Sequence, residues 1–411
     1  MDNGIKIISG RGELNTLRES KTTRLREKRE ANLPARTKEV ANLLMGWSER
    51  DYSAKAKLME AVSTADFIGI MSQINDQAML AQYARLPSVW QSFSSRVTVP
   101  DFRPQRMRSW FEDLTQLPEQ NGGFPRAAMA LPRVPELSEY PTFSLQEERE
   151  QFGVGKYGKR FPFSWEAFVN DEYQVIQSLP AIMAQTANDT EDILTTMVLA
   201  GPDGPQAPFF NTTEDFGSLV PAGNYLEGNP ALSIPALEQA LENVSMRRVN
   251  GRPVTVNSWV LVVPPSLEFT ARRIASVAEY TYVEGDPSLP SGQTRMVLPN
   301  LVSGRFQVVV NPWLATIDES ETAATTWYLV PAGGSDGTRQ AIVTAFLAGE
   351  EVPDLRISGL QGQAIGGGSI DPYRGSFSHD DVQYRVRHIL GAMGLNNAPV
   401  VVSLGTGNGE S

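Results

Sequence analysis

The side chains that most often carry enzyme chemistry are scarce in this sequence. It contains no cysteine and only two histidines, His379 and His388. Without cysteine there is no disulfide, thiol nucleophile, Cys-ligated zinc or iron–sulfur site. Two histidines leave few candidates for a general base or an imidazole metal ligand. We therefore expect no catalytic residue, no metal site and no cofactor.

The histidines and carboxylates have ordinary structural explanations. His379 precedes Asp380-Asp381, which is typical of a turn before a strand. His388 lies in the alternating segment from Val382 onward, where a structural hydrogen bond is the usual outcome. Carboxylates are plentiful, but no spacing singles out an acid/base pair.

Two glycine clusters also lack the context of a phosphate-binding loop. Gly405-x-Gly407-x-Gly409 has no helix after it, and Gly366-Gly367-Gly368-Ser369 has no following Lys-Ser/Thr. A phosphate loop needs the backbone N–H groups of a helix N-terminus or such a lysine. We expect no nucleotide site at either cluster.

Charge is distributed unevenly along the 411 residues, a length that predicts two or three structural units. The 36 lysines and arginines and 47 acidic residues give a net charge of −11. Residues 1–60 hold 13 basic and 9 acidic residues, a net +4, so the remainder carries −15. The N-terminal segment thus reads as a polar, basic arm without a core of its own.

The densest basic stretch of this arm runs from Arg18 to Arg29, and its candidate contact residues are Arg24, Arg26, Lys28 and Arg29. Three interpretations stay open: a clamp on acidic surfaces of neighbouring subunits, a contact with DNA phosphates, or a solvated tail. Intervening glutamates at 19, 27 and 30 favour the clamp over DNA. No apolar run approaches the ~18–20 residues of a membrane span, and a secretory signal pattern is absent, so we expect a soluble protein made in the cytoplasm.

The first half of the chain predicts a helix, a ribbon and a longer helix. Apolar spacing from Asp66 predicts an amphipathic helix that stops near Pro87. Residues 97–165 alternate in short runs, which predicts a long two-stranded excursion. Such a hairpin is marginal alone, so it must lie on something else. Residues 165–199 predict the longest helix, in which Pro180 implies a kink or a new first turn.

The second half predicts a mixed α+β unit and a C-terminal pair of strands. Helices are expected at 234–247 and 266–276, and strands at 259–263, 306–310, 327–330 and 341–347. Period-two alternation over 382–388 and the apolar run 400–404 predict two further strands.

Several short motifs follow one another in order along residues 65–404. They are Ala65-Asp66-Phe67, Lys156-Tyr157-Gly158-Lys159, Phe163-Ser164-Trp165-Glu166, Leu261-Val-Val-Pro-Pro265, Asn311-Pro312-Trp313, Trp327-Tyr328-Leu329 and the segment from Asp380 to Gly391. In order and spacing they resemble the major capsid proteins of tailed bacteriophages. The resemblance implies the Hong Kong 97-type capsid fold, which is α+β.

The resemblance also implies a domain organisation. The divisions are 1–64, an N-terminal arm; 65–118, the first part of a peripheral domain; 119–162, the extended E-loop hairpin; 163–222, the peripheral domain with its spine helix; 223–350, the axial domain; 351–398, peripheral strands with a three-fold turn; and 399–411, a return to the axial domain and tail.

Function and partners follow from the same resemblance. Pentamers and hexamers of this chain would build an icosahedral head around packaged double-stranded DNA, which contacts the inner face non-specifically. The implied partners are scaffolding, portal and possibly decoration proteins, with no membrane, and the implied location is the virion, assembled in the host cytoplasm. Scaffolding would be a separate protein or the short arm.

Two inter-subunit contacts are expected. The ribbon near 131–160 should lie across a neighbouring subunit, where Glu147, Glu148 and Glu150 meet basic side chains and Lys156 and Lys159 are further contact candidates. The turn from Gly391 through Asn396 and Asn397 should lie where three capsomers meet, with an ordinary surface loop as the alternative. Covalent crosslinking is not expected, because Leu145 and Gln146 occupy the stretch where some relatives carry a lysine.

Two alternatives to a phage capsid protein stay open. An encapsulin-like nanocompartment would use the same fold to hold cargo protein, and the basic arm argues weakly against it. A hydrolase with an α+β core would need convergent polar groups that the sequence does not display.

Overall fold

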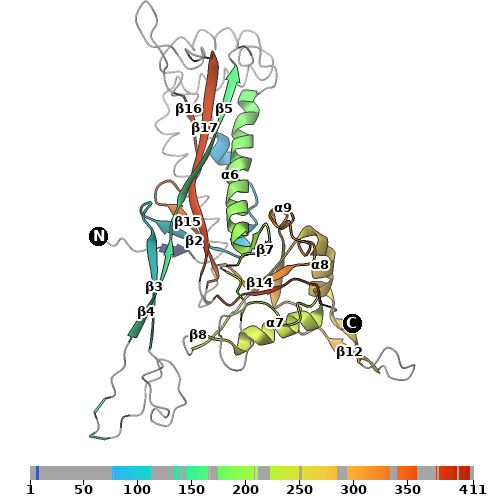
Figure 1. The fold of residues 1–411 in the computed structure, drawn as a ribbon. Helices are drawn as coiled ribbons and strands as arrows, with labels where there is room; N and C mark the ends of the chain where they lie inside the picture. Colours follow the sequence, from blue (N-terminus) through green and yellow to red (C-terminus); the bar gives the residue numbers. More distant parts are fainter. Residues whose placement is uncertain are drawn as a thin grey trace, which may run out of the picture.

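The fold is known from a computed structural model. It describes residues 6–8, 76, 78–112, 134, 136–137, 139–140, 145–164, 166, 175–207, 209–211, 223–249, 252–284, 294–333, 340–358, 376, 379–395 and 398–407. Within these ranges the two largest sheets have six and four strands, and helices pack against them (Figure 1). The predicted α+β class is confirmed.

The six-stranded sheet has the order β1-β2-β15-β17-β16, and β5 pairs with β17 outside this path. Its strands are β1 (Lys6–Ile8), β2 (Ser95–Val99), β5 (Gly155–Ser164), β15 (Ile342–Leu347), β16 (Asp354–Ile357) and β17 (Asp381–Gly394). The central strand β17 is bordered by β5 over residues 381–390, by β16 over 384–387 and by β15 over 390–394.

Helix α6 (Val175–Leu199) covers one face of this sheet (Figure 1). Its residues Leu179, Met183 and Ala187 recur every four positions, which places them on one stripe of the helix. They share a buried cluster with Val382 and Val386 of β17. The period-two pattern read from the sequence is therefore the face of β17 that meets α6.

The four-stranded sheet has the order β13-β10-β14-β18. Its strands are β10 (Trp259–Val263), β13 (Phe306–Val310), β14 (Trp327–Pro331) and β18 (Val401–Ser403), and its helices are α7 (Ile234–Met246) and α8 (Glu268–Ser276). All five residues of β10 are buried because both faces are covered. Leu261 lies in the cluster shared with α7 and α8, and Val260 and Val262 lie in the cluster toward the other sheet.

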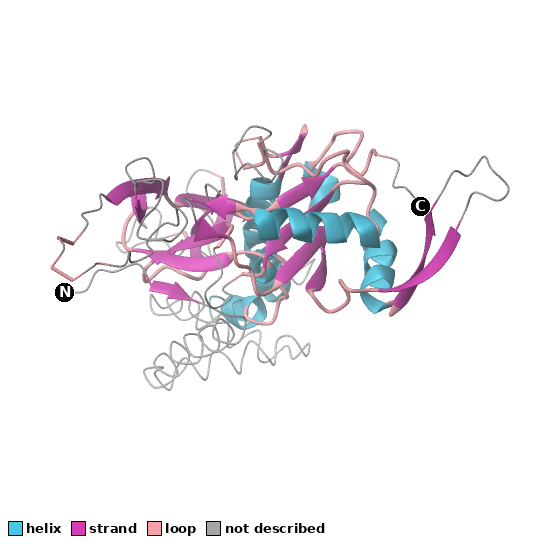
Figure 2. Ribbon diagram, turned by 90° about the horizontal axis from the view of Figure 1, so that it is seen from below, coloured by secondary structure: helices cyan, strands magenta, loops and turns pink. Residues whose placement is uncertain are grey.

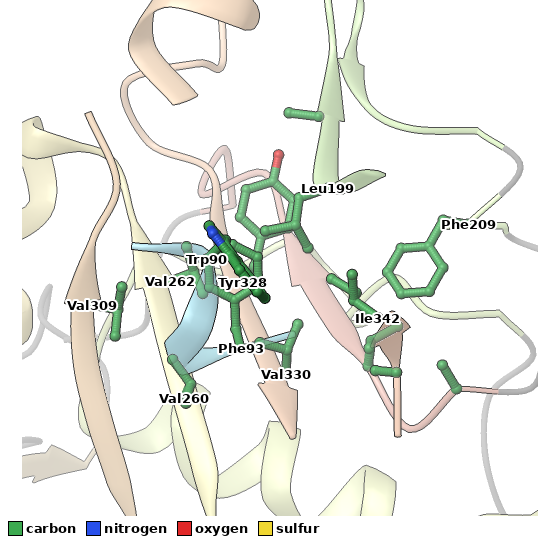
Figure 3. Packing of buried hydrophobic residues seen from close by; sticks show 14 of the residues in the cluster. Trp90, Phe93, Leu199, Phe209, Val260, Val262, Val309, Tyr328, Val330 and Ile342 are labelled. Carbon is green, nitrogen blue, oxygen red and sulfur yellow. The ribbon is translucent and has the colours of Figure 1, made fainter. Parts of the chain in front are cut away.

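One apolar cluster joins the two sheets (Figure 3). Ile342 and Phe346 come from the six-stranded sheet, and Tyr328 and Val330 come from the four-stranded sheet. Trp90 of the short 3-10 helix η1 (Trp90–Ser92) is 1% exposed and packs among them. The two sheets therefore share part of their core.

Two hairpins extend beyond the packed body. Strands β3 (Gln105–Glu112) and β4 (Leu145–Phe152) form a two-stranded antiparallel ribbon, and β11 (Glu279–Glu284) and β12 (Thr294–Pro299) form a second hairpin (Figures 1 and 2). The remaining short elements are β6 (Ala200–Gly201), β7 (Gly204–Pro205), β8 (Arg248–Val249), β9 (Arg252–Pro253), η3 (Pro265–Leu267) and α9 (Leu314–Ile317).

Three details differ from the expectations. The strand at 341–347 is present as β15, but it belongs to the six-stranded sheet rather than to the α+β unit of 223–350. The paired ribbon comprises 105–112 with 145–152, whereas 155–164, expected largely within the 119–162 hairpin, pairs with β17. Helix α6 continues through Pro180, so of the two alternatives, a kink or a new first turn, the new first turn is wrong. The other expected strands and helices from 234 onward are present, and residues 78–83 are helical.

Candidate functional site: inter-subunit surfaces

The β3–β4 ribbon is the segment that the sequence singled out for contact with a neighbour. Its register pairs Glu147 with Trp110, Glu148 with Ser109 and Glu150 with Met107. Among the described residues no third strand pairs with either β3 or β4. The three glutamates therefore lie on a two-stranded element, and an isolated hairpin of this kind is at best marginal in water.

The face of the six-stranded sheet opposite α6 carries a row of arginines. The register places Arg160 of β5 opposite Arg385 of β17, and Arg385 opposite Arg356 of β16. Directly paired residues on neighbouring strands share one face of a sheet, so the three side chains form one line across three strands. All three are exposed, and the next residue of β17 on this face is Arg387. We call Arg160, Arg385 and Arg356 the arginine row.

Few carboxylates offset these charges. Asp354 is 2.7 Å from Arg356 and 3.3 Å from Arg387, and Glu350 is 2.9 Å from Arg387. Within the described part of the chain, neither Arg160 nor Arg385 has an ion pair. Like charges directly opposite each other in a sheet are destabilising, so the row is electrostatically incomplete in one subunit.

The candidates Lys156 and Lys159 are both exposed on β5, but they lie on opposite faces. Lys159 pairs with Val386, whose side chain is on the α6 side, whereas Lys156 pairs with Ile389 on the other face. Only Lys156 therefore shares the face of the arginine row.

A buried polar junction holds the segment before β2 against α6 and β17. Glu191 of α6 has no exposed surface and accepts hydrogen bonds from the Tyr83 hydroxyl and from Trp90 Nε1 at 2.8 Å. His388 Nε2 lies 2.9 Å from Glu191 Oε1. The structural hydrogen bond expected for His388 is confirmed, whereas its carboxylate partner was not anticipated.

The adjacent carboxylate anchors the backbone of the same segment. Asp192 Oδ1 accepts the N–H groups of Val89 at 2.9 Å and Trp90 at 3.0 Å. Burial raises the pKa of Asp192 from 3.8 to about 7, with the nearby Glu191 adding to the rise, while the Trp90 and Val89 hydrogen bonds oppose it. The sequence analysis did not identify these two acids, which position the segment before β2 against α6 and β17.

Gly391 is not in a turn, and this expectation is corrected. It lies within β17 and pairs with Ala345 of β15. A Cβ at this position would overlap the carbonyl oxygen of Gly153, so glycine is required by a close backbone approach. Asn396 and Asn397 lie outside the described residues, as do the arm residues Arg24, Arg26, Lys28 and Arg29.

The other sequence candidates also have structural roles. His379 and Asp380 form the turn that precedes β17, where Asp380 has a φ of 51°. In the described parts of the chain, no group of three or more His, Cys, Asp or Glu residues is arranged to bind a metal ion. No described helix combines the length and apolar character that crossing a membrane requires.

Comparison with known proteins identifies the family to which the chain belongs. The model of a phage capsid protein family matches residues 147–396, which is more than half of the chain. No curated protein matches. Similar solved structures include the capsid of a native GTA particle (12% identity, 77% of this chain and 90% of that chain, TM-score 0.43). They also include the mature capsid of bacteriophage PhiM1 (11%, 77% and 86%, TM-score 0.42) and Mycobacterium phage Patience (15%, 85% and 87%, TM-score 0.39).

The assignment to a family rests on the match to the family model. Its range begins in the ribbon and extends through α6 and the strands β10, β13 and β14 of the four-stranded sheet to the end of β17. The chain belongs to the phage capsid protein family and is a structural protein of a phage head.

Proposed function

We propose that copies of this chain associate as pentamers and hexamers into an icosahedral head that encloses double-stranded DNA. One observation supports this most directly: the β3–β4 ribbon extends from the body as a two-stranded element without a third strand among the described residues. A hairpin of this kind is at best marginal in water. A neighbouring subunit would supply the surface that stabilises it.

In this proposal the six-stranded sheet with α6 forms the peripheral domain, and the four-stranded sheet with α7 and α8 forms the axial domain. The partners would be scaffolding and portal proteins, with assembly in the host cytoplasm and non-specific DNA contact on the inner face. The buried acids Glu191 and Asp192 and the histidine His388 hold structure together, and we propose no catalytic role for them.

Expression of the chain, alone and together with the scaffolding protein of the same phage, tests the proposal. Electron microscopy and sedimentation should show closed shells of uniform diameter. DNase-protected DNA in particles from infected cells would identify a genome container, whereas enclosed cargo protein without DNA would identify a nanocompartment. A chain that stays monomeric under both conditions would contradict the proposal.

A further inference from the structure

The strand β18 is hydrogen-bonded along both of its edges. On one side it pairs with three residues of β14. On the other side the Val402 N–H donates to the Asn224 carbonyl, and the Val402 carbonyl accepts the Leu226 N–H, both at 2.9 Å. We call β14 together with residues 224–230 the strand site. Without β18, both sides of this site would carry unpaired backbone groups.

Alternate residues of the segment in the site enter two different cores. Val400 and Val402 belong to the cluster that joins the two sheets, whereas Val401 belongs to the cluster of the four-stranded sheet with α7 and α8. All three residues are 0% exposed. Protein interiors are close-packed, so the site fits an extended segment with apolar side chains of this size on both faces.

Polar groups of the site select one register of the segment. The Arg247 side chain, which is buried, donates from Nη1 to the Val400 carbonyl at 2.9 Å. The Ser403 hydroxyl donates to the Pro230 carbonyl at 2.7 Å. A shift of one residue would turn every side chain to the opposite face and break both bonds.

The Gly405-x-Gly407 motif, which lacks the context of a phosphate loop, is explained by the strand site. Gly405 has a φ of 66°, and a Cβ on it would overlap the carbonyl oxygen of Thr325. A Cβ on Gly407 would overlap the carbonyl oxygen of Gly228, and the Gly407 N–H donates to the Asn229 carbonyl at 2.8 Å. The site therefore requires the pattern Val-Val-Ser-x-Gly-x-Gly.

Both sides of the strand site are positioned by elements other than β18. Strand β14 pairs with β10 over residues 328–331. Residues 224–230 precede α7, and Leu226 packs in the cluster that α7 shares with β10. The site thus has a frame that does not depend on the segment that fills it.

We infer that the strand site is a peptide-binding site specific for an extended segment with this pattern, and that residues 398–407 are its resident, separable ligand. Pairing of the main chain on both edges provides affinity, and the buried side chains and the glycines provide specificity. The ligand follows closely on β17, which ends at Gly394, so its binding also fixes the two sheets to each other. The inference goes beyond the proposed function and does not depend on it.

Substitution of both glycines in the full chain tests the inference. In Gly405→Val/Gly407→Val the new side chains meet backbone carbonyls, so the segment should leave the site. A fluorescent peptide with the natural sequence of residues 398–407 should then bind this variant at least tenfold more tightly than the wild type, whose site is filled, as measured by fluorescence anisotropy. The same peptide carrying both substitutions should not bind. The control variant Thr406→Val changes an exposed position between the glycines and should behave as the wild type.

A cut chain keeps the test decisive if the double variant does not fold. A protease recognition sequence placed at residues 396–397 is cleaved after the otherwise wild-type chain has folded. The segment from residue 398 onward should stay bound through gel filtration, and the fluorescent peptide should replace it in mild denaturant. A segment that exchanges only when the whole chain unfolds would be part of the core rather than a ligand, and would overturn the inference.

Two further results would also refute it. Failure of both the double variant and the cut chain to take up the natural peptide would show that the site does not bind a separate segment. Equal binding of the natural and the glycine-substituted peptides would show apolar capture without the assigned pattern. Neither experiment requires a shell, so a chain that forms no shells would refute the proposed function and leave this inference intact.

Discussion

His388 Nε2 lies 2.9 Å from Glu191 Oε1 in the contact between β17 and α6. Their side chains are 3% and 0% exposed, respectively. Because Tyr83 and Trp90 donate to the same carboxylate, one acid ties the sheet, the helix and the segment before β2 together. An unpaired buried polar group costs about 1–3 kcal/mol, so each of these residues depends on the others.

Removal of the shared acid should destabilise the subunit. Glu191→Ala leaves the donors on Trp90, Tyr83 and His388 without this acceptor, and we expect a loss of about 3 kcal/mol in the free energy of unfolding. Urea denaturation of unassembled subunits measures the loss. The control Glu242→Ala, at an exposed site on α7, should change stability by less than about 0.5 kcal/mol. Equal stability of the two variants would contradict the role assigned to Glu191.

Asp192 should make stability depend on pH. Its folded pKa of about 7 lies above the ordinary 3.8, so between these values the folded protein holds a proton that the unfolded chain has released. Stability from this group is therefore present at low pH and decreases as pH rises through about 4 to 7. The steepest part of the decrease approaches 1.4 kcal/mol per pH unit.

The variant Asp192→Asn keeps an oxygen for the N–H groups of Val89 and Trp90 but does not titrate. Other titrating groups cancel when the wild type and this variant are compared. The wild type should lose stability relative to the variant as pH is raised from 5 to 8, as measured by denaturation at each pH. A difference that stays constant over this range would show that Asp192 is not a titrating group of the junction.

Gly391 should tolerate no larger residue. In Gly391→Ala the new Cβ meets the backbone carbonyl of Gly153, and backbone cannot move aside as a flexible side chain can. We expect a loss of about 2 kcal/mol, in the range of overpacked cores. The matched control is Gly153→Ala, whose Cβ would have nothing within 4 Å, and it should leave stability unchanged or slightly raised. If both variants behave alike, the close approach is not what requires glycine.

Arg247 should secure the C-terminal strand. This side chain is 1% exposed, and its Nη1 donates to the Val400 carbonyl and to Asn224 Oδ1, both at 2.9 Å. Arg247→Met leaves these buried acceptors without the donor, so amide hydrogen exchange in β18 should accelerate at least tenfold. The exposed Arg273→Met should leave exchange in β18 unchanged. Wild-type exchange in Arg247→Met would show that Arg247 does not secure β18.

Much of the fold was predictable because burial follows local periodicity. The alternation of Val382, Tyr384 and Val386 marks one buried face, and the five apolar residues of β10 mark a strand covered on both sides. The apolar run of β15 was equally clear as a strand. The sheet to which β15 belongs was not predictable, because an apolar run does not indicate with which of two sheets it pairs.

The candidate site was harder to predict because its contacts are distant in sequence. Glu191 and Asp192 look like part of a solvated helix face, and their donors on Tyr83 and Trp90 lie about a hundred positions earlier. The arginine row required the register of three strands, which alternation alone does not give. The segment that begins at Gly391 has the composition of a turn. Glycine is required at 391 because the carbonyl group of Gly153, on a neighbouring segment, lies too close for a Cβ.

Electron cryo-microscopy of shells assembled from the purified chain tests the central claim most directly. The account predicts closed icosahedral particles in which the β3–β4 ribbon of each subunit lies on an adjacent subunit. Assembled particles in which every ribbon packs wholly against its own subunit, or a purified chain that stays monomeric even with its scaffolding protein, would contradict it.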